Sequence, residues 1–346
     1  MRAAVIKEHG DLDVVSVVDD LPVPEPGRGE VRVQIKAAAL NRLDLWVREG
    51  WPGLNLQMPH VMCADGAGIV DALGDGVTGF DVGDRVSVDP SIVPANDPAI
   101  MTGMENQTRH LHILGEGVPG VAAEYVVLPA RNLLKMPDDF PFEGAAAAGL
   151  VYVTAWHSLM TRGGLRAGET VLIVGAGGGV NSASIQIAKL AGATVFVVGS
   201  SAEKCAKAKE LGADVVHDRS EDPNWSKAFY KLTNKRGFDV VIDNVGQATL
   251  NNSIRSTRIG GRILIVGNTS GPKVEIDIRQ IFARQISIIG STMGPHQDYV
   301  QVMNLVFSGA LDPVVGKVFP LDEVKEAQRT LAGFDVFGKV VLSLDQ

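Results

Sequence analysis

The residues with the clearest chemical use are the glycines of a short segment that begins at Gly175. They follow an apolar run at residues 170–174, and a helical pattern begins at residue 182. Glycine lets the backbone approach a phosphate closely, and the N–H groups of a helix N-terminus attract an anion. We therefore predict that this segment cradles the pyrophosphate of a nucleotide. Its residues are Gly175, Ala176, Gly177, Gly178, Gly179 and Val180.

The pattern around these glycines makes the prediction more specific. The strict G-x-G-x-x-G fingerprint is absent, because Val180 takes its sixth position, and a purely structural glycine turn is the alternative. Strand patterns at residues 194–199 and 239–243 alternate with helical patterns at 182–190 and 202–211. Such alternation is typical of a doubly wound parallel sheet, which binds dinucleotides at the carboxyl ends of its strands. We expect the loops after the later strands to contact the nicotinamide half, through Asn244, Gly246, Val266, Gly267 and Asn268.

The end of the second strand bears on which dinucleotide binds. Folds that prefer NAD usually place an acidic residue there, which binds the ribose 2′-hydroxyl. Here Ser200 and Ser201 follow the strand and Lys204 comes one turn later, so no carboxylate at the tip repels a 2′-phosphate. Arg219, after the third strand, adds a second cation. We predict NADPH in preference to NADH; the alternative, that a serine only caps the next helix, is compatible with this role.

Composition limits the partners and the compartment. The chain has 346 residues, 45% of them hydrophobic, which is enough for two domains. Its net charge of −8 argues against nucleic acid or an anionic membrane as the main partner. The two cysteines, Cys63 and Cys205, exclude a disulfide framework and any four-cysteine metal site. We find no membrane-spanning run and no signal-peptide core, and expect a cytoplasmic enzyme with a small-molecule substrate.

Strand and turn patterns divide the chain along its length. Short strands separated by turns extend to about residue 130, with a long irregular excursion at residues 90–120. Helical patterns at 141–150 and 154–162 lead into the nucleotide-binding part, and the last fifty or so residues return to short strands with one helix at 322–331. We predict a β-rich catalytic domain at residues 1–145, a dinucleotide-binding domain at 146–290 and a return to the catalytic domain at 291–346.

Four segments carry a family resemblance, in order around the glycine segment: residues 38–44, 59–70, 151–156 and 337–340. Taken together, they make the chain resemble the medium-chain dehydrogenase/reductase superfamily over essentially its whole length. The strongest likeness is to its zinc alcohol dehydrogenase-like and quinone oxidoreductase-like members. This resemblance implies an α/β fold, with a Rossmann doubly wound parallel sheet and a GroES-like (chaperonin-10-like) β-barrel-type catalytic domain. It also implies a homodimer or homotetramer, Thr154 beside the nicotinamide, and Lys339 within reach of the cofactor.

The chain departs from the zinc-dependent members of this superfamily at the metal positions. Asn41 stands where those members have Cys, and Ala64 and Asp65 stand where they have a His–Glu pair. Leu150 lies near the position of a further metal ligand of those members. Cys63 and Asp65 remain as possible donors, but a catalytic zinc needs three converging protein ligands. We therefore expect no catalytic zinc.

The structural zinc of the superfamily is expected to be absent as well. Four residues of the excursion take the positions of its four cysteines: Pro94, Asp97, Ile100 and Thr108. We expect nothing to replace this cross-link, so that the lobe is mobile or packed against a partner, and we expect His110 and His112 to be merely exposed.

Without zinc, alkoxide formation loses its main stabiliser, whereas conjugate reduction needs less help. Hydride is added to the β-carbon of an α,β-unsaturated carbonyl, and hydrogen-bond donors stabilise the enolate oxygen. We predict zinc-independent, NADPH-dependent reduction of an enone, quinone or enoyl thioester, with Asn41, Asp44, Asp65 and Tyr152 as candidate catalytic residues. Asn41 as a helix cap, Asp65 as an internal acceptor and Tyr152 as a packing residue are the structural alternatives. The rival functions are metal-free interconversion of ketone and alcohol, and a non-catalytic NADPH sensor.

Overall fold

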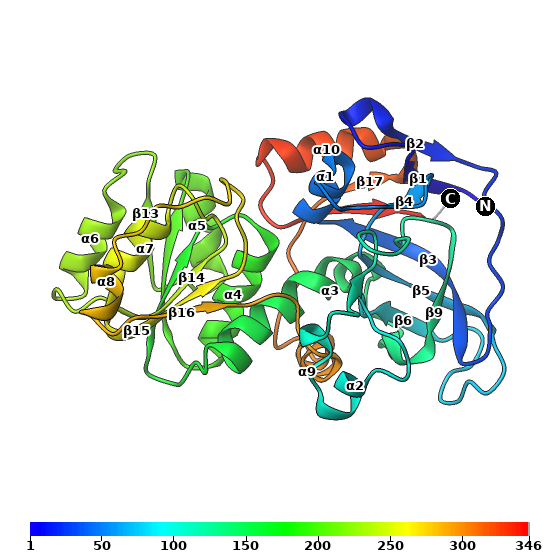
Figure 1. Ribbon diagram of the computed structural model, residues 1–346, viewed down its shortest axis with the longest axis horizontal. Helices are drawn as coiled ribbons and strands as arrows, with labels where there is room; N and C mark the ends of the chain where they lie inside the picture. Colours follow the sequence, from blue (N-terminus) through cyan, green and yellow to red (C-terminus); the bar gives the residue numbers. More distant parts are fainter. Residues whose placement is uncertain (345–346) are drawn as a thin grey trace. The chain divides into compact units, whose positions relative to one another are not determined.

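The computed structural model describes residues 1–344, and the chain divides into two compact units (Figure 1). Unit 1 contains residues 1–151, 295–309 and 313 onward. Unit 2 contains residues 152–294 and 310–312. Unit 1 is therefore assembled from both ends of the chain, and unit 2 is inserted between them.

A long strand, β3 (Glu30–Leu40), organises the main sheet of unit 1. It pairs antiparallel with β5 (Asp65–Leu73), β9 (Tyr125–Pro129) and β18 (Lys339–Ser343). Half-buried and buried positions alternate along its first half, and its last four residues are all buried, which indicates that both faces are covered at that end. The other strands of this seven-stranded sheet are β6 (Arg85–Val88), β10 (Leu133–Lys135) and β17 (Val315–Pro320).

Unit 1 also contains two smaller sheets and several helices. One sheet has the order β2 (Val15–Val18), β1 (Ala3–Ile6), β4 (His60–Val61), and the other pairs β7 (Ser91–Ile92) with β8 (His112–Ile113). The α-helices that lie wholly in unit 1 are α1 (Arg42–Glu49), α2 (Pro98–Thr102), α9 (His296–Phe307) and α10 (Val324–Gly333). Short 3-10 segments lie at Leu12–Val14, Glu105–Gln107, Ala130–Asn132 and Leu321–Glu323.

Two details of the helix predictions were wrong: the break between two predicted helical segments, and the number of helices in the final segment. The segments predicted at 141–150 and 154–162 form one helical stretch, α3 (Phe142–Trp156) continued by a π-helical turn (His157–Arg162), because no Gly or Pro interrupts residues 151–153. The final segment contains a second helix, α9, that we did not predict. Its buried residues Tyr299, Val302, Met303 and Val306 have the helical i, i+3, i+4, i+7 spacing.

The sheet of unit 2 is parallel and doubly wound, as predicted. Its six strands have the order β13-β12-β11-β14-β15-β16. Strand β11 pairs with β12 on one side and with β14 on the other, so the winding direction changes there. The bounds are β11 (Thr170–Val174), β12 (Thr194–Gly199), β13 (Val215–Asp218), β14 (Phe238–Asp243), β15 (Thr257–Ile265) and β16 (Ser287–Gly290).

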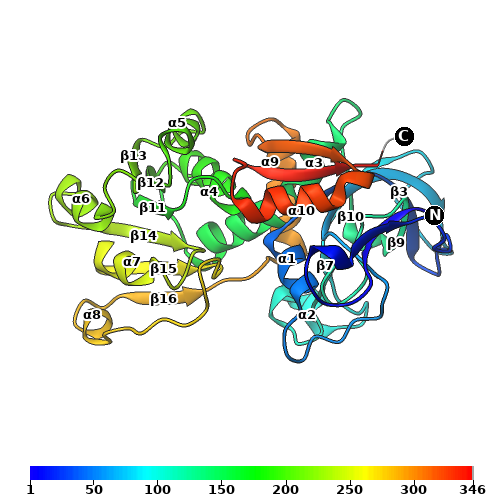
Figure 2. The same cartoon turned by 90° about the horizontal axis from the view of Figure 1, so that it is seen from above.

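Helices cover this sheet and pack against it (Figure 2). They are α4 (Gly179–Leu190), α5 (Ala202–Glu210), α6 (Trp225–Leu232), α7 (Leu250–Ser256) and α8 (Arg279–Phe282). The rings of Phe196, Phe229 and Phe238 meet edge to face, with centroids 4.9 to 5.7 Å apart, and join β12, α6 and β14. No helix in residues 1–344 is both long enough and apolar enough to cross a membrane.

Candidate active site

A buried polar cluster lies at one end of the main sheet of unit 1. It consists of Asn41, Asp44, Asp65 and Lys339, none more than 6% exposed. Asn41 follows β3 and precedes α1, Asp44 lies in the first turn of α1, and Asp65 and Lys339 begin β5 and β18. Because β3 pairs with both β5 and β18, the sheet brings these residues to neighbouring strand ends.

The centre of the polar cluster is a salt bridge between Lys339 and Asp65. The Lys339 ammonium donates to Oδ2 of Asp65 over 2.9 Å and to Oδ1 of Asn41 over 2.5 Å. The Asn41 amide group donates to the same Asp65 oxygen over 2.8 Å. The second Asp65 oxygen accepts from the backbone N–H of Leu150 over 2.6 Å. The carboxylate is therefore neutralised and fully hydrogen-bonded, as a buried charge must be.

Helix α3 comes very close to this carboxylate. A Cβ atom added at Gly149 would lie 2.3 Å from Oδ1 of Asp65, so no larger residue fits there without movement. We did not predict a role for Gly149. The signal was its position beside Leu150, where the superfamily resemblance placed a metal ligand.

Asp44 is the second carboxylate of the polar cluster and has different partners. Its two oxygens accept the backbone N–H groups of Asn41, over 2.7 Å, and Cys63, over 2.8 Å. Burial raises the pKa of Asp44 to about 6, although these hydrogen bonds and the Lys339 charge lower it. The Cys63 thiol is fully buried in the hydrophobic core, and burial raises its pKa well above the usual value, so it is a poor nucleophile or metal ligand.

Tyr152, the fourth candidate catalytic residue, is held by partners within unit 2. It belongs to unit 2, is 1% exposed, and donates its hydroxyl hydrogen to the carbonyl oxygen of Asp312 over 2.8 Å. Gln186 donates to the same hydroxyl and also bonds both backbone groups of Asp312. Burial raises the pKa of Tyr152. These contacts fit the structural alternative, in which Tyr152 fastens residues 310–312 to unit 2.

The glycine segment has the geometry expected of a phosphate cradle. Gly175 directly follows β11 with a φ of 109°, a conformation that glycine adopts without strain. Helix α4 begins at Gly179, and its N-cap residue Gly178 has no side chain to cap the first N–H groups. A Cβ atom at Gly177 would meet the Lys204 side chain at 3.3 Å. The structure therefore brings Lys204 to the glycine segment.

The other residues predicted to determine the preference for NADPH over NADH lie at or near the tip of β12. Ser200 is exposed, and Ser201 caps α5 by accepting from the Lys204 backbone N–H over 3.3 Å. The Arg219 backbone N–H donates to the Gly199 carbonyl over 3.1 Å, which places Arg219 beside this tip. We missed Asp218, whose backbone pairs with Gly199 in the β12–β13 register. Its carboxylate is engaged by Ser220.

The loops after β14 and β15 pack against each other. The Val266 N–H donates to the Asp243 carbonyl over 3.0 Å. A Cβ at Gly246 would lie 3.1 Å from Cα of Asn268, and one at Gly267 would lie 3.1 Å from the Asn244 carbonyl oxygen. All five residues predicted to contact the nicotinamide half therefore lie in one loop pair.

Asp243 is a missed residue that shapes this loop pair. It is fully buried, and its carboxylate accepts from the N–H groups of Val245 and Gly246 and from the hydroxyls of Thr249 and Ser253. An acidic residue at the end of a buried strand was the available signal. Thr154, in α3, is 5% exposed and lies 4.0 Å from the Met293 sulfur within unit 2.

The excursion at residues 90–120 contains a polar link that we predicted to be missing. Asp97 accepts from the Thr108 hydroxyl over 3.0 Å and contacts Nδ1 of His110 over 2.7 Å. Its other oxygen accepts from the Ala99 N–H over 2.8 Å. Asp97 and Thr108 occupy two of the four positions assigned to cysteines. The expectation that nothing replaces the cross-link was therefore wrong, and His110 is a member of this link.

Within residues 1–344, no group of three or more His, Cys, Asp or Glu side chains is arranged to hold a metal ion. At the polar cluster, the oxygens of Asn41 and Asp65 that would face a cation bind the Lys339 ammonium. A zinc ion at this position would meet a like charge and too few protein ligands. The donor set of the polar cluster therefore does not fit zinc.

Both units match known protein families. Residues 27–138 match the alcohol dehydrogenase GroES-like domain, and residues 179–308 match the zinc-binding dehydrogenase family. A zinc-type alcohol dehydrogenase-like protein of Schizosaccharomyces pombe is 35% identical over 92% of this chain and 91% of its own. Quinone oxidoreductase of Lama guanicoe is 30% identical (99% and 98% covered), and acryloyl-coenzyme A reductase of Metallosphaera sedula is 31% identical (99% and 100% covered).

Solved structures show the same similarity. An NAD-dependent alcohol dehydrogenase has a TM-score of 0.96 at 44% identity, with both chains fully covered. A 2-octenoyl-CoA carboxylase reductase, solved in complex with NADP and 2-octenoyl-CoA, has a TM-score of 0.89 at 29% identity, covering 99% of this chain and 87% of the other.

Proposed function

Because the chain belongs to the medium-chain dehydrogenase/reductase superfamily and is an NAD(P)H-dependent oxidoreductase, we propose that it reduces an activated carbon–carbon double bond or a quinone with NADPH and without zinc. The observation that carries this proposal is the salt bridge between Lys339 and Asp65. An ammonium group is a hydrogen-bond donor and a positive charge, but it is not a Lewis acid that activates an alcohol as zinc does.

The residues of the polar cluster supply what conjugate reduction needs. Reduced nicotinamide, when bound, supplies the hydride that adds to the β-carbon, and the double-bond electrons move to the carbonyl oxygen of the substrate. Lys339 uses two of its N–H donors on Asn41 and Asp65. Its third donor stabilises the developing enolate oxygen, and Asp65 and Asn41 hold the ammonium in position for this. The α-carbon takes its proton from water.

The substrate class is supported by the names of the relatives. They include quinone oxidoreductases and acryloyl-coenzyme A reductases, and one solved neighbour contains 2-octenoyl-CoA. Quinones and α,β-unsaturated thioesters share a double bond polarised by a carbonyl group. Hydride addition to either gives an enolate-type oxyanion that is then protonated, and an ammonium donor is sufficient to stabilise this oxyanion.

Residues near the tip of β12 support NADPH in preference to NADH. Ser200 is exposed there, Lys204 reaches the glycine segment, and Arg219 lies beside the tip. Two cations and a hydroxyl suit a 2′-phosphate, which carries close to two negative charges at neutral pH. Asp218 is the feature that favours NADH, and the solved neighbours include both an NAD-dependent protein and an NADP complex.

We also propose that the protein is a homodimer or homotetramer. Strand β16 is the edge of the unit 2 sheet, and its Ile288 is 38% exposed. An apolar sheet edge is a hazard that pairing with a second copy removes. Light scattering coupled to size-exclusion chromatography tests this directly, and a monomer at micromolar concentration would reject it.

A substrate panel tests the proposed function. NADPH oxidation is followed by the loss of reduced nicotinamide absorbance with quinones, small enones, enoyl-CoA thioesters and simple ketones. We expect turnover with one or more of the first three classes, unchanged by a metal chelator. Turnover with ketones alone would reject double-bond reduction, and tight NADPH binding without any turnover would establish a sensor. About one tightly held zinc ion per chain would reject the zinc-free reaction.

A further inference from the structure

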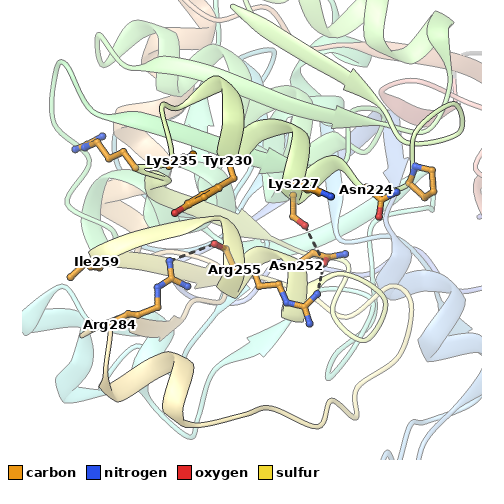
Figure 3. A pocket seen from close by; sticks show the side chains of 11 residues that line it. Asn224, Lys227, Tyr230, Lys235, Asn252, Arg255, Ile259 and Arg284 are labelled. Carbon is orange, nitrogen blue, oxygen red and sulfur yellow. Dashed lines mark hydrogen bonds between the residues drawn. The ribbon is translucent and has the colours of Figure 1, made fainter.

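A hollow of 590 Å³ lies within unit 2, between α6 and α7 (Figure 3). Lys235, which precedes β14, and Arg284, which precedes β16, are among its lining residues, so it reaches toward the amino ends of the strands. The predicted cofactor residues follow the carboxyl ends of the strands, and none of them lines this hollow. The α6–α7 hollow is therefore separate from the predicted nicotinamide site.

The lining of the α6–α7 hollow is strongly basic. It includes five cationic side chains and no Asp or Glu: Lys227, Lys235, Arg236, Arg255 and Arg284. This concentration contrasts with the net charge of −8 of the whole chain. A concave surface lined by one sign of charge attracts ligands of the opposite sign.

Most of these charges are not neutralised by neighbouring acids. Arg236 is the exception, because Asp239 accepts two of its hydrogen bonds, over 2.7 and 3.0 Å. Arg284 donates to the carbonyl oxygens of Ile254 and Thr257, and Arg255 donates to Oδ1 of Asn252 over 3.4 Å. Carbonyl and amide oxygens hold a guanidinium in place but leave its full charge available to an anion.

The α6–α7 hollow also presents a flat aromatic surface. Figure 3 shows Tyr230 projecting from α6, with Arg255 and Arg284 on the opposite side. Tyr230 is 41% exposed, and Ile259, another lining residue, is 65% exposed. A nucleobase stacks on such a ring regardless of its identity, while guanidinium and ammonium groups bind its phosphates.

We propose that the α6–α7 hollow binds a nucleotide with two or more phosphate groups, in addition to the nicotinamide cofactor. The volume lies within the range of pockets that hold small molecules of this size. Arg255 and Arg284 bind the phosphate groups from the α7 side, Lys227 binds them from α6, and Tyr230 stacks on the base. This site does not depend on the reaction proposed above.

Calorimetric titration of the full chain with ATP tests the proposal. NADPH is kept at one equivalent per chain, so that it fills the cofactor site without an excess that would compete for the α6–α7 hollow. We expect one ATP per chain, and weaker binding of tripolyphosphate, which lacks a base. Lys227→Glu should weaken ATP about tenfold by placing a like charge near the phosphates. Tyr230→Ala should weaken ATP to the level of tripolyphosphate and leave tripolyphosphate itself unchanged.

Lys231→Glu is the matched control, since it makes the same charge change on α6 at an exposed residue outside the lining. Its ATP affinity should equal that of the parent protein, and the KM for NADPH should be unchanged in both lysine variants. Absence of ATP binding with one equivalent of NADPH present would overturn the proposal, as would equal losses in the two lysine variants. Tripolyphosphate binding as tight as ATP would overturn the nucleotide assignment.

Discussion

The Lys339 ammonium lies 2.9 Å from a carboxylate oxygen of Asp65, with the two side chains 5% and 0% exposed. The residues are 274 positions apart in the chain. They meet because strands β5 and β18, which they begin, both pair with β3. Removing either charge alone would leave the other buried without its counter-charge, which makes the pair testable by single and double substitution.

The first prediction concerns the salt bridge between Lys339 and Asp65. Lys339→Met should lower the free energy of unfolding by about 3 to 5 kcal/mol, because the Asp65 carboxylate remains buried without its cation. The double variant Lys339→Met with Asp65→Asn should recover most of this stability. Both variants should lose most of kcat, since neither has the ammonium donor. Urea unfolding and reductase assays measure the two effects separately.

Lys135→Met provides the control for this experiment. Lys135 bonds Asp84 over 2.7 Å, but its side chain is 48% exposed, so we expect a loss below about 1 kcal/mol and unchanged kcat. A double variant at Lys339 and Asp65 that is stable and has parental kcat would show that the cation has only a structural role.

The second prediction concerns Asp44 and pH. Burial raises the pKa of this carboxyl from its ordinary value of 3.8 to about 6 in the folded protein. Between these values the folded state holds a proton that the unfolded state has released. The free energy of unfolding therefore falls as pH rises from about 4 to 6, by up to about 3 kcal/mol from this group.

Asp44→Asn removes this titration. The variant should be less stable by about 1 to 3 kcal/mol, because the Asn41 and Cys63 N–H groups donate to different oxygens of Asp44, and an amide has an acceptor at only one of these two positions. Its unfolding free energy should nevertheless decline less between pH 4 and 6 than that of the parent, as measured by urea titration at several pH values. Parallel pH profiles for the two proteins would contradict the raised pKa.

Local patterns predicted the fold of unit 2 well. The strand at Thr194–Gly199 and the glycine turn after β11 follow from apolar runs and glycine positions, which act within a few residues. Helix α9 was missed although its spacing was visible, because we read the end of the chain as strands.

The candidate site was harder to predict. The grouping of Asn41, Asp44 and Asp65 followed from the superfamily resemblance, but the place of Lys339 beside them depends on which strands flank β3. Strand order is a long-range property that no local pattern encodes. The Asp97 link was not predicted for a different reason: it replaces cysteines with residues of different chemistry.

The third prediction concerns the cofactor. Ser200→Asp puts a carboxylate at the exposed tip of β12, where it repels a 2′-phosphate and can accept from a 2′-hydroxyl. The KM for NADPH should rise about tenfold or more, while that for NADH is unchanged or falls. Ala206→Asp is the control for added charge, because Ala206 is exposed on α5 and is not a predicted cofactor residue, so both KM values should be unchanged. Equal changes for the two cofactors in Ser200→Asp would reject the assignment.

The fourth prediction concerns the excursion at residues 90–120. Asp97 joins Ala99, Thr108 and His110 through one carboxylate whose side chain is 3% exposed, and these hydrogen bonds lower its pKa. Asp97→Ala should therefore release the ends of α2 and speed cleavage between residues 93 and 112 by a broad-specificity protease. Because the folded pKa of Asp97 lies below its usual value, the stabilisation is present at neutral pH and is lost as pH falls through that folded value.

Met101→Ala, at a residue 92% exposed in the same helix, is the control and should leave the cleavage rate unchanged. Equal cleavage of the parent and Asp97→Ala at pH 7, mapped by mass spectrometry, would mean that the apolar contacts of the lobe hold it without this link.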